Sequence, residues 1–213
     1  MTFYFVPCNY DERMNIYLLG DSILDNAAYT HGDPAVSEHL NHLLGDTGRA
    51  TLLAVDGSVT AQVERQIQKL PTEATHVVLS SGGNDALAHQ DVLLQPATSV
   101  AEALLRFDAP LRALEADYRH VLAGIKATGL PGLCCTIYNG WMEEPIRSVV
   151  PLALRLFNDV IISLAMEYGF PVLDLRRVCT TATDYANPIE PSGPGGEKIA
   201  RAILHSFSVP VSG

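Results

Sequence analysis

Positive charge is scarce in this sequence. Its 213 residues include 14 lysines and arginines against 24 aspartates and glutamates, which gives a formal net charge of −10. Binding to nucleic acid or to an anionic membrane surface requires clustered cations that face the phosphate groups. The composition therefore argues against both kinds of partner and leaves a small molecule as the expected one.

Long hydrophobic runs are missing as well. A membrane-spanning helix needs about 18 or more consecutive apolar residues, and no segment reaches that length. Residues 1–13 lack the basic start and the long apolar stretch of a signal peptide, so we expect a cytoplasmic protein in which they form an N-terminal extension. Residues 14–213 are enough for one α/β domain.

Metal-ligand and nucleotide-binding patterns are also missing. No pair among Cys8, Cys134, Cys135 and Cys179 has the C-x-x-C spacing of a metal site, and we expect buried free thiols. His39 and His42 lie three residues apart on a predicted helix without acidic or cysteine partners, so we predict no metal there. No glycine-rich phosphate loop follows the first predicted strand, which makes a nucleotide-binding module the weakest of three functional alternatives.

Short apolar segments alternate with helical patterns along the chain. Segments rich in β-branched residues or leucine predict buried parallel strands. They cover residues 15–19, 50–54, 76–80, 132–138 and 171–175. Helical patterns cover residues 35–44, 60–70, 99–127 with a break at Pro110, 151–168 and 195–207. This alternation predicts right-handed βαβ crossovers in one doubly wound domain, with residues 85–98 as a surface excursion.

The first three predicted strands end in residues that fit one catalytic site. Ser22 follows the first strand in Gly-Asp-Ser, Gly57 follows the second in Asp-Gly, and Asn84 follows the third in Gly-Gly-Asn-Asp. Ligands of open α/β sheets bind beyond the carboxyl ends of the strands. The Ser22 hydroxyl is therefore a candidate nucleophile. The backbone N–H groups of Ser22 and Gly57 and the Asn84 amide are candidate donors to a tetrahedral oxyanion.

These segments resemble the SGNH hydrolases, also called GDSL-type esterases and lipases. Ser22, Gly57 and Asn84 match the first three blocks of that family in order, and the blocks extend over most of the chain. The resemblance implies a flavodoxin-like three-layer α/β/α sandwich with a five-stranded parallel sheet. It also implies hydrolysis of carboxylic esters, small acyl or acetyl esters among them, without a metal or an organic cofactor.

The fourth block departs from the pattern of the family, which is Asp-x-x-His-Pro-Ser. Here the segment reads Asn-Pro-Ile-Glu-Pro-Ser, so Asn187 falls at the aspartate position and Glu190 at the histidine position. No histidine lies between His120 and His205. A carboxylate with a pKa near ~4.3 is a poor base at neutral pH unless burial raises that pKa. The apolar neighbours of Glu190 favour such burial, which makes Glu190 the candidate base.

Other residues remain open as participants. His31 and His89 follow the strand-end segments and are alternative bases, although histidines in such loops are more often solvated. Asp21, Asp25, Asn26 and Tyr29 lie close to Ser22 in the sequence and are candidates for contacting the substrate.

Two functions compete for this scaffold. The first is a serine esterase with Ser22 as nucleophile and an unusual base. The second is a pseudoenzyme that binds an acyl or sugar group in the same cleft. Removing triad members from a serine protease leaves roughly 10³–10⁴-fold catalysis over water, so the loss of the histidine predicts a slow enzyme or a binding protein.

Overall fold

The strands of the protein form one parallel sheet, seen in a computed structural model that describes residues 13–208. They are β1 (Met14–Gly20), β2 (Gly48–Leu52), β3 (His76–Ser80), β4 (Gly132–Cys135) and β5 (Val172–Leu173). Their order across the sheet is β2-β1-β3-β4-β5, and every neighbouring pair is parallel. This is the flavodoxin-like order, so the predicted five-stranded, doubly wound fold is confirmed.

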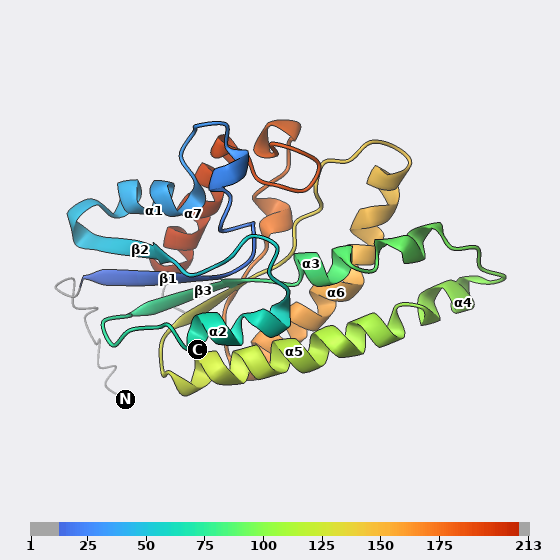
Figure 1. Ribbon diagram of the computed structural model, residues 1–213, viewed down its shortest axis with the longest axis horizontal. Coiled ribbons are helices and arrows are strands. Elements are labelled where there is room, and N and C mark those ends of the chain that lie inside the picture. Colours follow the sequence, from blue (N-terminus) through green and yellow to red (C-terminus); the bar gives the residue numbers. More distant parts are fainter. Residues whose placement is uncertain (1–12, 209–213) are drawn as a thin grey trace, which may run out of the picture.

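Helices cover both faces of this sheet (Figure 1). They are α1 (Val36–Leu44), α2 (Glu64–Ile67), α3 (Gly83–Leu87), α4 (Val100–Leu105), α5 (Asp108–Ala127), α6 (Ile146–Tyr168) and α7 (Gly193–Ser208). The pair α1 and α7 packs on one face, and the pair α5 and α6 packs on the other. Short 3₁₀ helices lie between them, at Ala27–Tyr29, Gly45–Thr47, Thr60–Gln62, Gln90–Leu94, Leu175–Arg177 and Ala182–Asp184.

Two adjacent cysteines of β4 mark the two hydrophobic cores. Cys135 packs in the core under α1 and α7, whereas Cys134 packs in the core under α5 and α6. Neighbouring residues of a strand point to opposite faces, as the sequence predicted for this pair. Both are buried free thiols, as is Cys179, while Cys8 and nearly all of the N-terminal extension lie outside the described residues.

Proline positions explain where the helix predictions were wrong. The break expected at Pro110 lies earlier, between α4 and α5, and Pro110 is the third residue of α5. Proline is tolerated there because the first turn of a helix has no acceptor for its N–H. The helix expected to begin at Pro151 begins at Ile146 instead, so Pro151 lies inside α6 and leaves one carbonyl of that helix without its usual donor.

Among the described helices, α6 has the length and the apolar composition of a membrane span. It packs against α5, and it buries Phe157, Ile161 and Leu164 in the core below the sheet. These side chains form the buried face of α6, and 28% of its most apolar 18-residue window is buried.

The carboxyl ends of β1 and β3 meet at the point where the chain changes direction across the sheet. Gly20, the last residue of β1, pairs with Ser80 of β3. Gly20 has a φ of +128°, and a Cβ atom at this position would lie 1.7 Å from the Ser80 carbonyl oxygen. Only glycine permits this approach. It brings the residues that follow β1 next to those that follow β3, at the switch point where such sheets bind ligands.

Candidate active site

Ser22 lies in a tight turn directly after β1. The turn is closed by the main-chain carbonyl of Asp21, which accepts hydrogen bonds from Leu24 and Asp25. Behind it, the Gln66 side chain accepts from the Gly20 N–H at 2.7 Å and donates to the Gly20 carbonyl at 2.9 Å. Sequence analysis missed Gln66, whose only signal was a single amide in an apolar helical stripe. Its role is to hold the end of β1 so that the Ser22 turn has one orientation.

Glu190 lies on a loop that is fastened along its length. Asn187 Oδ1 accepts hydrogen bonds from the N–H groups of Ile189 and Glu190, both at 2.9 Å. Tyr138 Oη donates to the Ile189 carbonyl at 2.5 Å, and the Ala186 N–H donates to the Glu190 carbonyl at 2.9 Å. Asn187 therefore shapes the turn through main-chain groups and does not bond to the Glu190 carboxylate.

The structure brings Ser22 and Glu190 together. Ser22 Oγ donates a hydrogen bond to Glu190 Oε1 at 3.1 Å, and only 6% of Glu190 is exposed. Burial raises the pKa of Glu190 to about 7, with a further increase from the Asp56 carboxylate and an opposing effect of the Ser22 hydrogen bond. A carboxyl group with this pKa is about half ionised at neutral pH, which suits a group that accepts and returns a proton.

Two of the three predicted oxyanion donors line the same cavity. Ser22 and Asn84 both line one cavity, and Asn84 Nδ2 donates to the Ser58 carbonyl at 2.9 Å. Because an amide group has two N–H donors, the second stays free for a ligand. Gly57 precedes Ser58 in an exposed turn with a φ of +76° and is not among the residues that line the cavity. Its role as a donor stays a prediction.

Asp21 is buried beside Ser22 and has no cationic partner among the described residues. Its Oδ1 accepts from the Ile23 N–H at 3.2 Å, and its Oδ2 has no hydrogen-bond partner. Burial raises the pKa of Asp21 to about 8, and the nearby carboxyl groups of Glu190 and Asp85 act in the same direction. At neutral pH Asp21 is therefore mostly uncharged, because an isolated carboxylate is costly in an apolar interior.

This burial predicts a stability effect of Asp21→Asn. A carboxyl whose pKa rises on folding contributes stability that is complete below its unfolded pKa of 3.8 and is lost as the pH rises through about 8. The wild type loses this stability as the pH rises and Asp21→Asn does not. We therefore expect the free energy of unfolding of Asp21→Asn, relative to that of the wild type, to increase by about 1 kcal/mol for each pH unit between pH 5 and pH 8. Urea denaturation at several pH values measures it. The control Asp46→Asn, at an exposed position, should show the same dependence of stability on pH as the wild type. The same pH dependence in Asp21→Asn would contradict the prediction.

The other candidates for substrate contact, Asn26, Asp25 and Tyr29, form hydrogen bonds that connect neighbouring loops. Asn26 is fully buried, and its side chain accepts from the Val36 N–H at 2.9 Å and donates to the Pro191 carbonyl at 3.2 Å. It therefore fixes the Glu190 loop to the start of α1 and does not reach the cavity. Asp25 accepts from the Asp56 N–H at 2.9 Å, and Tyr29 donates to the Asp56 carboxylate at 2.7 Å. Neither residue lines the cavity.

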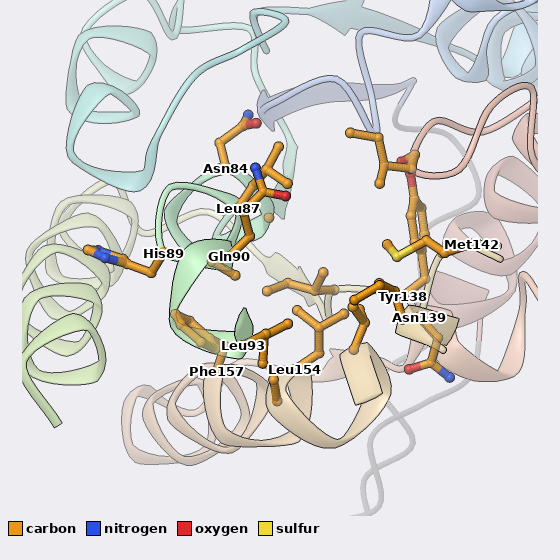
Figure 2. A pocket seen from close by; sticks show the side chains of 18 of the residues that line it. Asn84, Leu87, His89, Gln90, Leu93, Tyr138, Asn139, Met142, Leu154 and Phe157 are labelled. Atoms are coloured by element: carbon orange, nitrogen blue, oxygen red, sulfur yellow. The ribbon is translucent and has the colours of Figure 1, made fainter. Parts of the chain in front are cut away.

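No histidine contacts the Ser22 hydroxyl among the described residues. His31 is exposed on its loop and is not part of the cavity wall. His89 is also exposed, and Figure 2 shows its side chain directed away from the other labelled lining residues. His39 lies on α1 and contacts the Gly193 carbonyl through Nε2 at 3.1 Å. Within residues 13–208 no group of three or more histidine, cysteine or acidic residues is arranged to hold a metal ion.

Ser22 and Glu190 both line a cavity of about 480 Å³. Figure 2 shows other side chains of its wall. Beyond these polar groups its wall consists mainly of hydrocarbon side chains from α3, from the 3₁₀ helix at Gln90–Leu94 and from α6. The segment 85–98, predicted to be a surface excursion, supplies Ala86, Leu87 and Leu93 to this wall. The three leucines at 87, 93 and 94 were the available signal, but nothing in their spacing says which surface they face.

A nucleophilic hydroxyl at the switch point of a doubly wound sheet, with a proton acceptor bonded to it, is the arrangement of an acyl-transferring hydrolase. The model of the GDSL-like lipase/acylhydrolase family matches residues 18–198. The chain belongs to this family, which confirms the resemblance drawn from its strand-end segments, and the reaction class of the family is ester hydrolysis.

Solved structures with a similar fold include enzymes that act on different esters. An extracellular lipase from Streptomyces rimosus has a TM-score of 0.65 and 16% identity, over 90% of this chain and 99% of the lipase. A phospholipase A1 from Streptomyces albidoflavus has a TM-score of 0.68 and 17% identity, over 92% and 100%. An acetyl xylan esterase variant from Geobacillus stearothermophilus has a TM-score of 0.64 and 17% identity, over 94% and 97%. No curated protein sequence matches the chain significantly.

Proposed function

We propose that the protein is a serine hydrolase in which Ser22 attacks the acyl carbon of a carboxylic ester and Glu190 is the general base. The hydrogen bond from Ser22 Oγ to Glu190 Oε1 at 3.1 Å is the observation that carries this proposal. The pKa of about 7 at Glu190 supports it, because an ordinary carboxylate would be too weak a base to take the serine proton.

The chemistry follows from these groups. As Ser22 Oγ bonds to the acyl carbon, its proton moves to Glu190, and the carbonyl oxygen becomes an oxyanion. The free N–H of the Asn84 amide and the main-chain N–H groups of Ser22 and Gly57 are the proposed donors to that oxyanion. When the tetrahedral intermediate collapses, Glu190 returns the proton to the leaving alcohol. A water molecule then attacks the acyl-serine while Glu190 takes its proton. The bond from the acyl carbon to Ser22 Oγ breaks, Glu190 returns the proton to Ser22 Oγ, and the carboxylic acid is released.

The altered fourth block is consistent with a glutamate in this role. A histidine base needs a carboxylate partner that fixes its tautomer and stabilises the imidazolium, whereas a glutamate becomes neutral when it is protonated. The position of Asn187, which bonds to the main chain of the loop, matches this reduced requirement. The pair of replacements is therefore chemically coherent, since the second partner loses its function once the histidine is gone.

Covalent labelling tests the proposal directly. A fluorophosphonate probe reacts with an activated serine, so intact-mass and peptide analysis should find one adduct on the wild type, at Ser22. The Ser22→Ala protein should stay unlabelled, and Ser206→Ala, which removes a serine from α7, should label normally. An adduct at another serine would contradict the assignment of the nucleophile.

A pseudoenzyme that holds an acyl or sugar ligand in the same cleft is the second candidate. Two observations favour it: no histidine reaches the Ser22 hydroxyl in the described part of the chain, and the neighbouring buried Asp21 is itself mostly uncharged. Under this alternative the wild type would not react with the probe and would not release nitrophenol from esters, while an acyl ligand would still bind with measurable heat.

A further inference from the structure

We propose that the site accepts esters of medium-length, unbranched fatty acids, in the range from hexanoyl to decanoyl, and that α6 sets the upper limit of chain length. The proposal rests on the proposed function, because the acyl carbonyl has to lie at Ser22. It differs from the sequence-based expectation of small acyl or acetyl esters, and the chain-length test below distinguishes the two. The reason is the cavity of about 480 Å³ beside Ser22, a volume typical of pockets for much larger ligands than an acetyl group.

The chemistry of the wall selects a hydrocarbon chain. Leu87, Leu93, Ile137, Met142, Val150 and Leu154 all line the cavity. No lysine or arginine lines it, so an anionic or phosphorylated group would be buried there without a charge partner. A sugar would leave most of its hydroxyl groups without hydrogen bonds against these side chains, which costs free energy for each unpaired group. A methylene chain has no polar group to leave unpaired and gains contact with the hydrocarbon side chains that make up most of the wall.

Two aromatic rings, those of Phe107 and Phe157, form part of the cavity wall. In Figure 2, Leu93, Leu154 and Phe157 lie on the side of the cavity opposite Asn84. Phe157 is buried and meets Phe107 edge-to-face, with the ring centroids 6.4 Å apart and the ring planes at 86°. Displacing either ring would break this packing, so the pair resists movement. An acyl chain that starts at Ser22 therefore runs along α6 and ends against a fixed wall.

The small side chain of Ala153 leaves space in the cavity next to α6. It lines the cavity one turn before Phe157 on α6, and its methyl group leaves space that a larger side chain would fill. Leu152, the preceding residue, is 59% exposed and does not line the cavity. A phenylalanine can thus be placed on α6 inside the cavity, at residue 153, or outside it, at residue 152. The comparison separates an effect on substrate chain length from an effect on the stability of the helix.

The test is the chain-length dependence of kcat/KM with p-nitrophenyl acetate, butyrate, hexanoate, octanoate and decanoate. Each methylene that the cavity buries adds up to roughly fourfold, so we expect octanoate to exceed acetate by at least tenfold. In Ala153→Phe the octanoate-to-acetate ratio should fall at least tenfold, while Leu152→Phe should keep the ratio of the wild type. If Ala153→Phe does not fold, Val150→Phe narrows the same wall. Acetate as the best substrate, or an unchanged ratio in the folded cavity variants, would overturn the proposal.

A binding measurement separates this proposal from the proposed function. Octan-1-ol is uncharged and unreactive, and titration calorimetry with Ser22→Ala reports its binding without any turnover. We expect saturable binding of octan-1-ol that Ala153→Phe weakens at least tenfold and Leu152→Phe does not. If the wild type hydrolyses no ester but this pattern holds, the proposed function fails and the hydrocarbon site stands. If esters are hydrolysed but octan-1-ol does not bind, the hydrocarbon site fails alone.

Discussion

Replacing Glu190 by glutamine is expected to lower kcat for ester hydrolysis by about 10³-fold, within the range typical of losing a general base. Glutamine has the size of glutamate and can still accept the hydrogen bond that Ser22 donates, but it cannot take the proton. The loop itself is held by main-chain bonds and by the Asn187 side chain, so the fold should persist. Steady-state kinetics measures kcat, and a thermal unfolding curve shows whether the fold persists.

The pH profile of the wild type belongs to the same prediction. Glu190 acts as a base only when it is ionised, so kcat should rise as the pH increases through about 7, well above the ordinary range of a glutamate. The exposed carboxylate variant Glu143→Gln should keep both the rate and the profile. Full activity in Glu190→Gln would show that Glu190 is not the base and would make His31 and His89 the next residues to replace.

The Asn84→Ala variant is expected to lose about 10²–10³-fold in kcat with little change in KM, because an oxyanion donor acts mainly in the transition state. The substitution also removes the bond from Asn84 to the Ser58 carbonyl, which should cost about 1 kcal/mol of stability. Kinetics with one ester at saturating and limiting concentrations separates kcat from KM, and urea denaturation gives the loss of stability.

Asn15→Ala is the matched control for this second variant. Its side chain also donates to a main-chain carbonyl, that of Glu73, at 3.0 Å, and it lies at the amino end of β1, away from the cavity. It should lose comparable stability and no activity. Equal losses in kcat and in substrate affinity for Asn84→Ala would instead assign Asn84 to positioning the substrate.

A carboxylate as the general base, as proposed, would restrict the pH range in which the enzyme works. Glu190 and Asp21 are both buried near Ser22, and the charge of Glu190 raises the pKa of Asp21. In the proposed mechanism the ionised Glu190 activates Ser22, while ionising Asp21 as well would place a second negative charge beside the developing oxyanion. The geometry therefore favours turnover in the interval where Glu190 is ionised and Asp21 still holds its proton, which is a narrow range around neutral to slightly basic pH.

Much of the fold followed from the sequence because its signals are local. The buried strands are short apolar runs, and Ser22, Gly57 and Asn84 were recognised from their positions directly after predicted strands. Their order along the chain, with βαβ crossovers of one hand, places them at one edge of the sheet. Glu190 was identified differently, because only the resemblance to the SGNH hydrolases places it at the histidine position of the family motif. Cys134 and Cys135 were assigned to opposite faces from the period of a strand alone.

Only the tertiary structure decided how these residues meet and what surrounds them. The contact of Ser22 with Glu190 joins residues 168 positions apart, and the raised pKa of Glu190 comes from the burial that this packing creates. Asn26 was expected to contact the substrate. Its side chain instead forms hydrogen bonds with Val36 and Pro191, which are far apart in the sequence. The cavity needs α6 and the segment 85–98 to face each other across a gap, and the shape of a gap is a property of packed side chains that no local pattern encodes.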